Sequence, residues 1–509
     1  MDKIKLFNFR SAFSCQANRD CGFLNICNEA NLCAHQDLTF GLVEIISYVL
    51  ISIIVGLANV GGLGGGIIKV PILVIILNFS VKEATFLSYP ILLGGVLSNV
   101  ILLIFQRHPK KDKPIIDFDL ALILVPTILL GTVLGVLMNI IISEIILSSV
   151  FIVFLFIVCL YLFMKARDMK QKQQEDKEEQ DSMPQNKNNS NNEQNENKLS
   201  KSTILLVKQN SYMSETDQKK IEQIDEYCQK EYGIEYYEVV SQDSQEQSSG
   251  EDSKSNPNKQ KQDNKIENKQ LAEFMDQEKK MIPLNKLFYL ILMFLVFTFI
   301  GISKGGKGFQ SIFGIQKCDD LYFLLTALQL VSSIVFMSLI YLQQKRLHEY
   351  KIQIKYQFDR EDFQFSNHRF FILCLTGLAA GSVTGMLGMG AGLIILPVLL
   401  SLGCHTRVCS STSGFMYLFI GGTSIIYVIT EGVLSYKMIL FYALLALIGG
   451  LLFSNILYFY VNKYNLQSLI IWIILFVALL NLVSMPYYIY AKSNQYGWDS
   501  LMKNQSFCD

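Results

Sequence analysis

The chain has 509 residues, of which 51% are hydrophobic and 17% charged, and its formal net charge is zero. The charges are concentrated in one polar block between long uncharged stretches, which is typical of a polytopic membrane protein and argues against a soluble globular enzyme. Membrane lipid is therefore an expected partner, and nucleic acid is not.

The first segment, residues 1–38, carries four evenly spaced cysteines, Cys15, Cys21, Cys27 and Cys33. No histidine or aspartate stands at zinc spacing, so two disulfides in an extracytoplasmic tail are predicted, with three pairings open and zinc binding as the alternative. Met1–Ser14 lacks the apolar core of a signal peptide. Either the first membrane helix translocates this tail, or the true start of the gene was lost.

Ten apolar stretches are long enough to cross the roughly 30 Å of bilayer hydrocarbon as helices. They are residues 39–60, 83–105, 117–139, 144–166, 284–302, 321–342, 370–387, 407–429, 436–460 and 468–490. Two shorter apolar segments, 67–78 and 391–402, cannot cross upright, so they are predicted to be half-helices.

Each half-helix follows a glycine cluster. An offset of 326 residues superposes Gly62, Gly64 and Gly66 on Gly388, Gly390 and Gly392, and Pro71 on Pro397. The chain is therefore predicted to be an internal duplication around two broken helices. We expect membrane repeat 1 at residues 39–166 and membrane repeat 2 at 369–490, with two connecting membrane helices at 284–342 and a cytoplasmic loop at 343–368.

The polar block, residues 167–283, is rich in Lys, Gln, Asn, Glu and Ser. Such a composition cannot bury enough apolar surface to offset the entropy of ordering, so a disordered cytoplasmic linker is predicted. One stretch within it, Ser214–Val240, has apolar residues at helical spacing. This stretch could fold on an unknown cytoplasmic protein, and the alternative is a solvated connector.

Basic clusters at Arg107–Lys113, Lys165–Lys172 and Lys345–Lys355 are separated by two spans each, so they lie on one side, which the positive-inside rule makes cytoplasmic. Both ends of the chain, including the tail 491–509, then lie outside. Cys318 and Cys508 join the amino-terminal four there, and a bridge between them is a hypothesis. Because repeat 2 begins from the cytoplasm, the two repeats are predicted to be inverted.

Inverted repeats with broken helices are the architecture of many secondary transporters. The first amides of a half-helix lack partners inside the helix, and the helix dipole there favours an anion. Glycine lets a ligand approach the backbone closely. We therefore predict a small-anion site at the repeat interface, made by Gly62, Gly64, Gly65, Gly66, Gly388, Gly390 and Gly392. The alternative is that the glycines only allow close helix packing.

Three side chains complete this predicted site. Lys69 is the only charge in the first broken-helix region, and it would hold the anion or a coupling proton; alternatively it snorkels toward the headgroups. The hydroxyls of Ser88 and Ser413 could complete the shell around an oxyanion. Alternatively, they satisfy carbonyl groups of their own helices.

Enzymatic signatures are absent from the sequence. Gly301–Gly308 resembles a phosphate-binding loop, but glycine replaces the magnesium-binding Ser or Thr and the segment follows a membrane helix instead of a strand. The five histidines form no paired metal ligands, and no nucleophile lies in a hydrolase motif. We expect neither an enzyme nor a cofactor.

Four segments together resemble the TauE/SafE sulfite exporter family, in its plant and protist branch: residues 62–71, 82–85, 107–122 and 385–397. The resemblance implies two inverted repeats and a transporter for sulfite, sulfonates or related sulfur-containing organic acids. Lys69 departs from the family by standing where an apolar residue is usual, and Ala391 replaces a glycine. A non-transporting membrane receptor or scaffold with a disulfide-bonded ectodomain is the competing interpretation.

Overall fold

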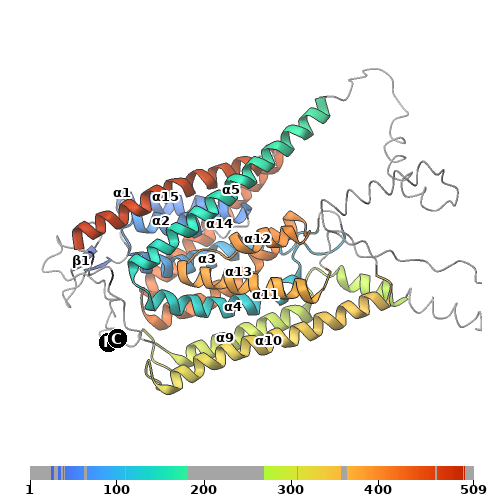
Figure 1. Cartoon of the computed structure of the whole chain (residues 1–509), viewed down its shortest axis with the longest axis horizontal. Coiled ribbons are helices and arrows are strands. Elements are labelled where there is room, and N and C mark those ends of the chain that lie inside the picture. The colour runs from blue at the N-terminus through green and yellow to red at the C-terminus, as the bar shows by residue number, and fades with distance from the viewer. Residues whose placement is uncertain are drawn as a thin grey trace, which may run out of the picture. The chain divides into compact units, whose positions relative to one another are not determined.

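The computed structural model is built almost entirely from helices (Figure 1), and its described residues are 25–27, 33–35, 38, 40–61, 66–108, 111–181, 269–306, 308–356, 364–464, 467–496, 498 and 502. Ten helices within these ranges are long and apolar enough to cross a membrane. The prediction of an all-α polytopic membrane protein is confirmed. A two-stranded antiparallel hairpin, β1 (Asn25–Cys27) and β2 (Cys33–His35), precedes the helices.

Twelve of the described helices fall into two series of five with a pair between them. The first series is α1 (Leu42–Gly61), α2 (Gly66–Ile75), α3 (Val81–Leu103), α4 (Phe118–Ile141) and α5 (Glu144–Asp181). The pair is α9 (Leu284–Lys304) and α10 (Asp320–Gln353). The second series is α11 (Asn367–Leu387), α12 (Gly392–Ser401), α13 (Thr406–Glu431), α14 (Tyr436–Tyr464) and α15 (Gln467–Tyr496).

The two series correspond helix by helix. The half-helices α2 and α12 each have 10 residues and begin 326 positions apart, at Gly66 and Gly392. Both contain a proline at the sixth position, Pro71 and Pro397. The fourth helices, α4 and α14, begin 318 positions apart, at Phe118 and Tyr436. The duplication therefore extends through the fourth helix, with eight residues fewer before it in the second copy.

The fourth helix of the first series crosses the first helix of the second at very close range. A Cβ added to Gly131 on α4 would lie 2.3 Å from the carbonyl oxygen of Leu378 on α11. One added to Gly135 would lie 2.2 Å from the carbonyl oxygen of Ser382. Small residues spaced by four let membrane helices approach closely enough for backbone contact. The crossing of α4 and α11 thus depends on glycine.

The equivalent crossing joins α14 to α1. A Cβ on Gly449 would lie 2.5 Å from Cβ of Ser52, and one on Gly56 would lie 2.5 Å from Cβ of Phe453. Under the two offsets, these four positions are the counterparts of the four that meet between α4 and α11. Each repeat therefore packs its fourth helix on the first helix of the other. The opposite orientation of the two repeats in the membrane stays a prediction.

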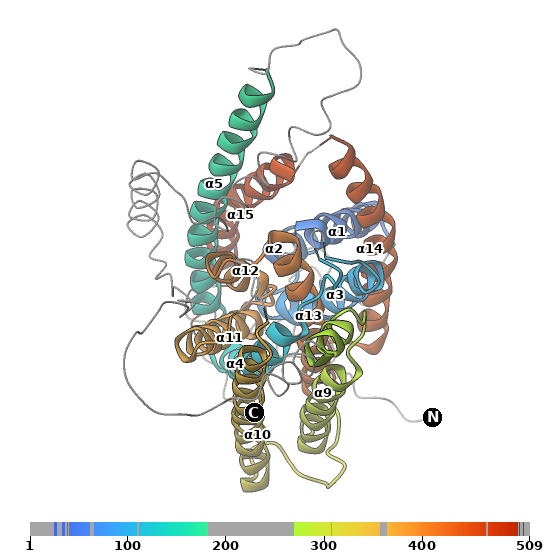
Figure 2. The same cartoon turned by 90° about the vertical axis from the view of Figure 1, so that its right-hand side faces the viewer.

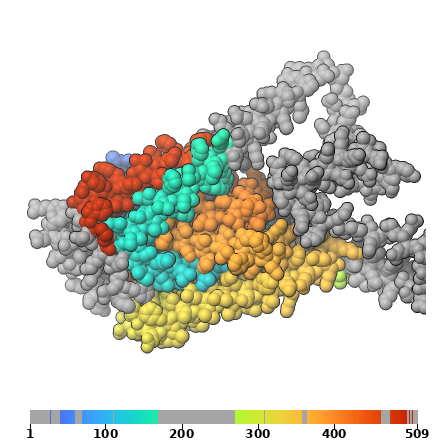
Figure 3. Space-filling view, in the orientation of Figure 1, coloured from blue at the N-terminus to red at the C-terminus, as the bar shows by residue number. Residues whose placement is uncertain are grey.

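Two central helices, α3 and α13, contact each other between these two crossings (Figure 2). Of the residues in the membrane span of α4, 83% are buried, whereas only 22% of those in the span of α10 are buried. On the face shown in Figure 3, where α11 and α12 are also visible, the surface includes three long helices, α5, α10 and α15. Large apolar side chains are exposed along all three, for example Phe156, Val331 and Phe476. This is the pattern expected where helices contact lipid.

Three helices run into segments that the sequence assigned to the linker, the cytoplasmic loop and the carboxyl-terminal tail. Helix α5 continues to Asp181, inside the predicted disordered linker, and residues 269–278 at the other end of that linker are also helical. Helix α10 reaches Gln353 through the predicted loop 343–368, and α15 reaches Tyr496 in the predicted tail. Lys, Glu and Gln are good helix formers, so polar composition alone did not exclude helix. The stretch Ser214–Val240 lies outside the described residues, and its binding of a partner stays a prediction.

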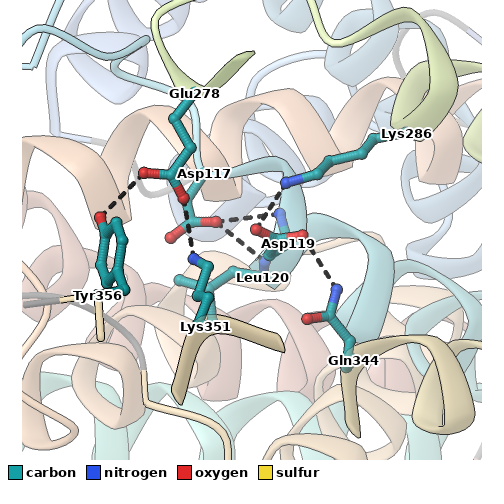
Figure 4. Close-up of polar contacts among 8 residues, drawn as sticks. All are labelled: Asp117, Asp119, Leu120, Glu278, Lys286, Gln344, Lys351 and Tyr356. Carbon is teal, nitrogen blue, oxygen red and sulfur yellow. Dashed lines mark hydrogen bonds and ion pairs between the residues drawn. The ribbon is translucent and has the colours of Figure 1, made fainter. Parts of the chain in front are cut away.

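An ion pair ties the connecting helices to repeat 1 (Figure 4). The Asp119 carboxylate, in the first turn of α4, lies 2.7 Å from Nζ of Lys286 on α9. Gln344 on α10 donates to the other carboxylate oxygen of Asp119 at 3.0 Å. Asp117 caps the same helix by accepting from the Asp119 amide at 3.0 Å. Burial raises the pKa of the Asp117 carboxyl, and the neighbouring Asp119 raises it further.

The end of the linker is fixed to α10 beside this ion pair. Glu278 lies 2.9 Å from Nζ of Lys351, and the Tyr356 hydroxyl donates to Glu278 at 2.9 Å (Figure 4). The Phe274 ring packs against Tyr356 and under the Lys351 amine. The last helical turns before α9 are therefore an ordered part of the membrane unit.

Candidate functional site

At the second broken helix, the backbone amides immediately before the start of α12 have no hydrogen-bond acceptor in the described part of the chain. Helix α11 ends at Leu387, and Gly388 turns the chain with a left-handed φ of 67°. The first bonded amide of α12 is that of Ile394, which donates to Ala391. Within the described part of the chain, the amides of the segment 390–392 donate no hydrogen bond, although the segment is buried. Buried unpaired amides at a helix N-terminus are suited to an anion.

The carbonyl groups at the end of α11 are satisfied by side chains from repeat 1. Three donors contact them: Ser88 to Gly388 (2.8 Å), Tyr89 to Gly385 (2.7 Å) and Asn139 to Met386 (2.6 Å). The Ser413 hydroxyl donates at 3.0 Å to Ser410, in its own helix. The Ser88 hydroxyl also lies 2.7 Å from the Thr85 carbonyl oxygen, so both predicted serines engage carbonyl groups of their own helices, which is the alternative that the sequence left open. Their role as substrate ligands stays a prediction.

The first broken helix contributes Lys69. Gly62, Gly64 and Gly65 lie outside the described residues, and Gly66 is the first residue of α2. Lys69 follows in the first turn of α2 and is only 1% exposed. In the part of the chain that the structure describes, its amine makes no hydrogen bond or ion pair. Lys69 therefore does not snorkel to the surface.

Lys69 lines a cavity of about 20 Å³ where the two repeats meet. Its walls come from α1, α2 and α3 of repeat 1 and from α13 of repeat 2. The polar residues in the lining are Asn59, Lys69, Asn99 and Tyr417, beside Gly95 and Gly414. The volume admits about one water molecule as the helices stand. Lys69 is the one charged residue in this lining.

The cavity's polar groups are partly fixed and partly unpaired. The Asn59 amide nitrogen lies within 3.1 Å of three acceptors: Gly95 O, Ser98 Oγ and Ser454 Oγ. Oδ1 of Asn99 and the Tyr417 hydroxyl are buried with no hydrogen-bond partner in the described part of the chain. Groups of this kind are costly to bury unless something completes their bonds. The cavity thus presents an amine, a phenol and an amide to a small polar ligand.

The predicted site residues form two groups. Lys69 lies in the cavity, whereas Ser88 and Gly388 contact each other at the second break. No residue of Gly388–Gly392 lines the cavity. The sequence patterns did not predict Asn59, Asn99 and Tyr417 as site residues. A polar side chain inside an apolar span was the available signal, because such residues commonly mark substrate pathways.

The structure describes only some of the cysteines that were predicted to form disulfides. Cys27 and Cys318 are each disulfide-bonded in the structure, and Cys27 faces Cys33 across the hairpin. Cys15, Cys21 and Cys508 lie outside the described residues. The connectivity, including a Cys318–Cys508 bridge, stays a prediction.

Comparison with known proteins identifies a family. The model of the sulfite exporter TauE/SafE family matches residues 48–202 and 372–498. The chain is 25% identical over 441 residues to sulfite exporter TauE/SafE family protein 2 of Arabidopsis thaliana, covering 85% of this chain and 80% of that protein. Family protein 1 of the same plant is 24% identical over 460 residues, covering 88% and 86%.

A third relative, family protein 3, is 46% identical over 83 residues, 16% of this chain and 17% of that protein. No solved structure matches the chain significantly. The family model covers more than half of the sequence, and its two segments include most of the duplicated helices. This multi-pass membrane protein belongs to the sulfite exporter TauE/SafE family, a family of transporters.

Proposed function

We propose that this protein is a secondary transporter of a small sulfur-containing anion, such as sulfite, a sulfonate or another sulfur-containing organic acid. The observation that carries the proposal is the unpaired Lys69 amine in a cavity at the contact between the repeats. A buried amine without a hydrogen-bond acceptor is costly, and more so when it is charged, so a ligand that supplies a negatively charged acceptor stabilises it. The unpaired Asn99 and Tyr417 groups set the ligand's orientation.

The broken helices offer further anion-binding groups outside the cavity. The unpaired amides of the segment 390–392, with those predicted at the start of α2, give anion-binding groups that need no arginine. Such groups at a repeat interface support alternating access, in which the two repeats move against each other around the bound solute. The cavity of about 20 Å³ then represents a closed state, which must widen to admit a sulfur oxyanion.

The choice of a sulfur-containing substrate rests on the relatives, which are named for a sulfite exporter family. The test is flux into liposomes containing the purified full-length chain. We expect uptake of labelled sulfite or methanesulfonate, with competition between the two and little inhibition by acetate or chloride. Protein that moves none of these anions would remove the proposal and favour the receptor or scaffold interpretation.

The orientation belongs to the same proposal: both chain ends lie outside the cytoplasm, and the linker lies within it. Two glycosylation sequons fall on opposite sides of this arrangement, one starting at Asn504 and the other at Asn188. Expression in a secretory-pathway host should give a glycan at Asn504 and none at Asn188. The measurement is the gel shift lost on glycosidase treatment, with each sequon removed in turn by Asn→Gln. A glycan at Asn188 would reverse the orientation.

A further inference from the structure

Lys69 has surroundings that disfavour its charged form while the cavity is empty. The side chain is 1% exposed, and its amine has no acceptor in the described part of the chain. Lys69 also stands in the first turn of α2, where the helix dipole repels a cation. A buried charge without a counter-charge is costly, so the empty cavity disfavours the ammonium form of Lys69. A structural role would require a partner, and none is present in the described residues.

No acidic group compensates Lys69 from the helices around it. Those helices are α1, α3 and α15, which pack on α2, and α13, which completes the cavity. Their charged side chains are Glu44, Lys82, Glu83, Arg407, Glu431 and Lys492, and none of them lines the cavity. Lys82 donates to the Ile140 carbonyl at 3.2 Å, and Glu83 caps α3. The titratable residue that shares the cavity with Lys69 is Tyr417.

We propose that Lys69 is the proton-coupling residue of this transporter: its amine is neutral in the empty cavity and takes up one proton when an anion binds. The inference rests on the proposed anion transport and adds the coupling ion and the residue that carries it. The only covalent change is a proton transfer: an O–H bond of a hydronium ion or a buffer acid in the solvent breaks, an N–H bond of the Lys69 ammonium forms, and the ammonium pairs with the anion. Departure of the anion reverses the step and returns the proton to the solvent.

Two consequences follow from this exchange. The moving load of a monovalent anion and a proton has no net charge, so transport is driven by a pH gradient and is insensitive to membrane potential. Because binding is linked to one proton, anion affinity falls about tenfold for each unit of pH above the titration of the empty site. An arginine in place of Lys69 stays charged and loses both properties.

The test counts protons taken up per anion bound by the purified full-length protein. Methanesulfonate and sulfite are the probes; methanesulfonate is the anion of a strong acid, so its proton count reports the protein alone. We expect about one proton per anion from the single linked site. Lys69→Arg should bind with no proton uptake. The matched control Lys82→Arg, a buried lysine outside the cavity, should behave as the wild type.

If Lys69→Arg fails to fold, flux measurements on the wild type test the same proton coupling. An imposed pH gradient should drive accumulation of the anion, and an imposed potassium diffusion potential should not. Anion binding without proton uptake, or flux that follows the membrane potential alone, would overturn the proposed role of Lys69 in proton coupling. The proposed anion transport would be unaffected. Failure of the wild type to bind either probe would instead overturn the proposed function and this inference with it.

Discussion

Replacing Lys69 with methionine is expected to abolish most anion transport while leaving the folded protein at least as stable as the wild type. Methionine has a similar length and suits an apolar cavity, but it offers no donor to an anion. The unpaired amine costs free energy in the empty state, so its removal relieves a strain in the fold. Loss of function with retained stability distinguishes a binding residue from a structural one.

The size of the effect follows from the bond that is lost. A charge-assisted hydrogen bond contributes about 1.5–3 kcal/mol. Apparent affinity for sulfite or methanesulfonate should therefore weaken by about tenfold to a hundredfold in Lys69→Met. The measurement is concentration-dependent flux in proteoliposomes, paired with a thermal unfolding curve of the same preparation.

Lys82→Met provides the matched control for this substitution. Lys82 is also a buried lysine, but its amine donates to the Ile140 carbonyl and it does not line the cavity. We expect its loss to lower the unfolding temperature and to leave flux per folded molecule near the wild-type value. Wild-type flux in Lys69→Met would show that the cavity does not carry the substrate.

The broken helices were predictable from sequence because their signals are local. A glycine cluster followed by an apolar run too short to cross defines a half-helix, and residues 67–78 and 391–402 anticipated α2 and α12 closely. The crossing of α4 with α11 was not anticipated. Its glycines are ordinary members of long apolar spans, and the offset that aligns the first three helices fails at α4 and α14.

Of the polar residues that line the cavity, only the charged one, Lys69, was predicted from the sequence. Lys69 stands out because a charge in an apolar run is rare. Asn59, Asn99 and Tyr417 are uncharged, and each becomes part of one cavity only where α3 meets α13, an arrangement that depends on packing between the repeats. The ends of the linker were missed for a related reason. Glu278 gains its place from Lys351 and Tyr356 on α10, far along the sequence.

The glycine crossing carries the second large expected effect: Gly381→Ala should strongly reduce the yield of folded protein. A Cβ on Gly381 would lie 2.1 Å from the carbonyl oxygen of Ile128 and 2.9 Å from its carbon. Both are backbone atoms of α4, so no side chain can rotate away and the two helices must separate. Such overpacking costs about 1–3 kcal/mol, occasionally more. The higher helix propensity of alanine over glycine offsets only about 1 kcal/mol of this cost.

The matched control is Gly301→Ala in α9, a buried helical glycine with room beside it. Its added Cβ would meet Cγ2 of Ile426 at 3.4 Å, an ordinary contact with a side chain. This variant should fold as well as the wild type or better, because alanine favours helix. Monodispersity in size-exclusion chromatography and thermal unfolding of both variants provide the measurement. Equal stability of Gly381→Ala and wild type would mean that α4 and α11 are further apart than described. The packing of each repeat's fourth helix on the first helix of the other, which places Lys69 where the repeats meet, would then be unsupported.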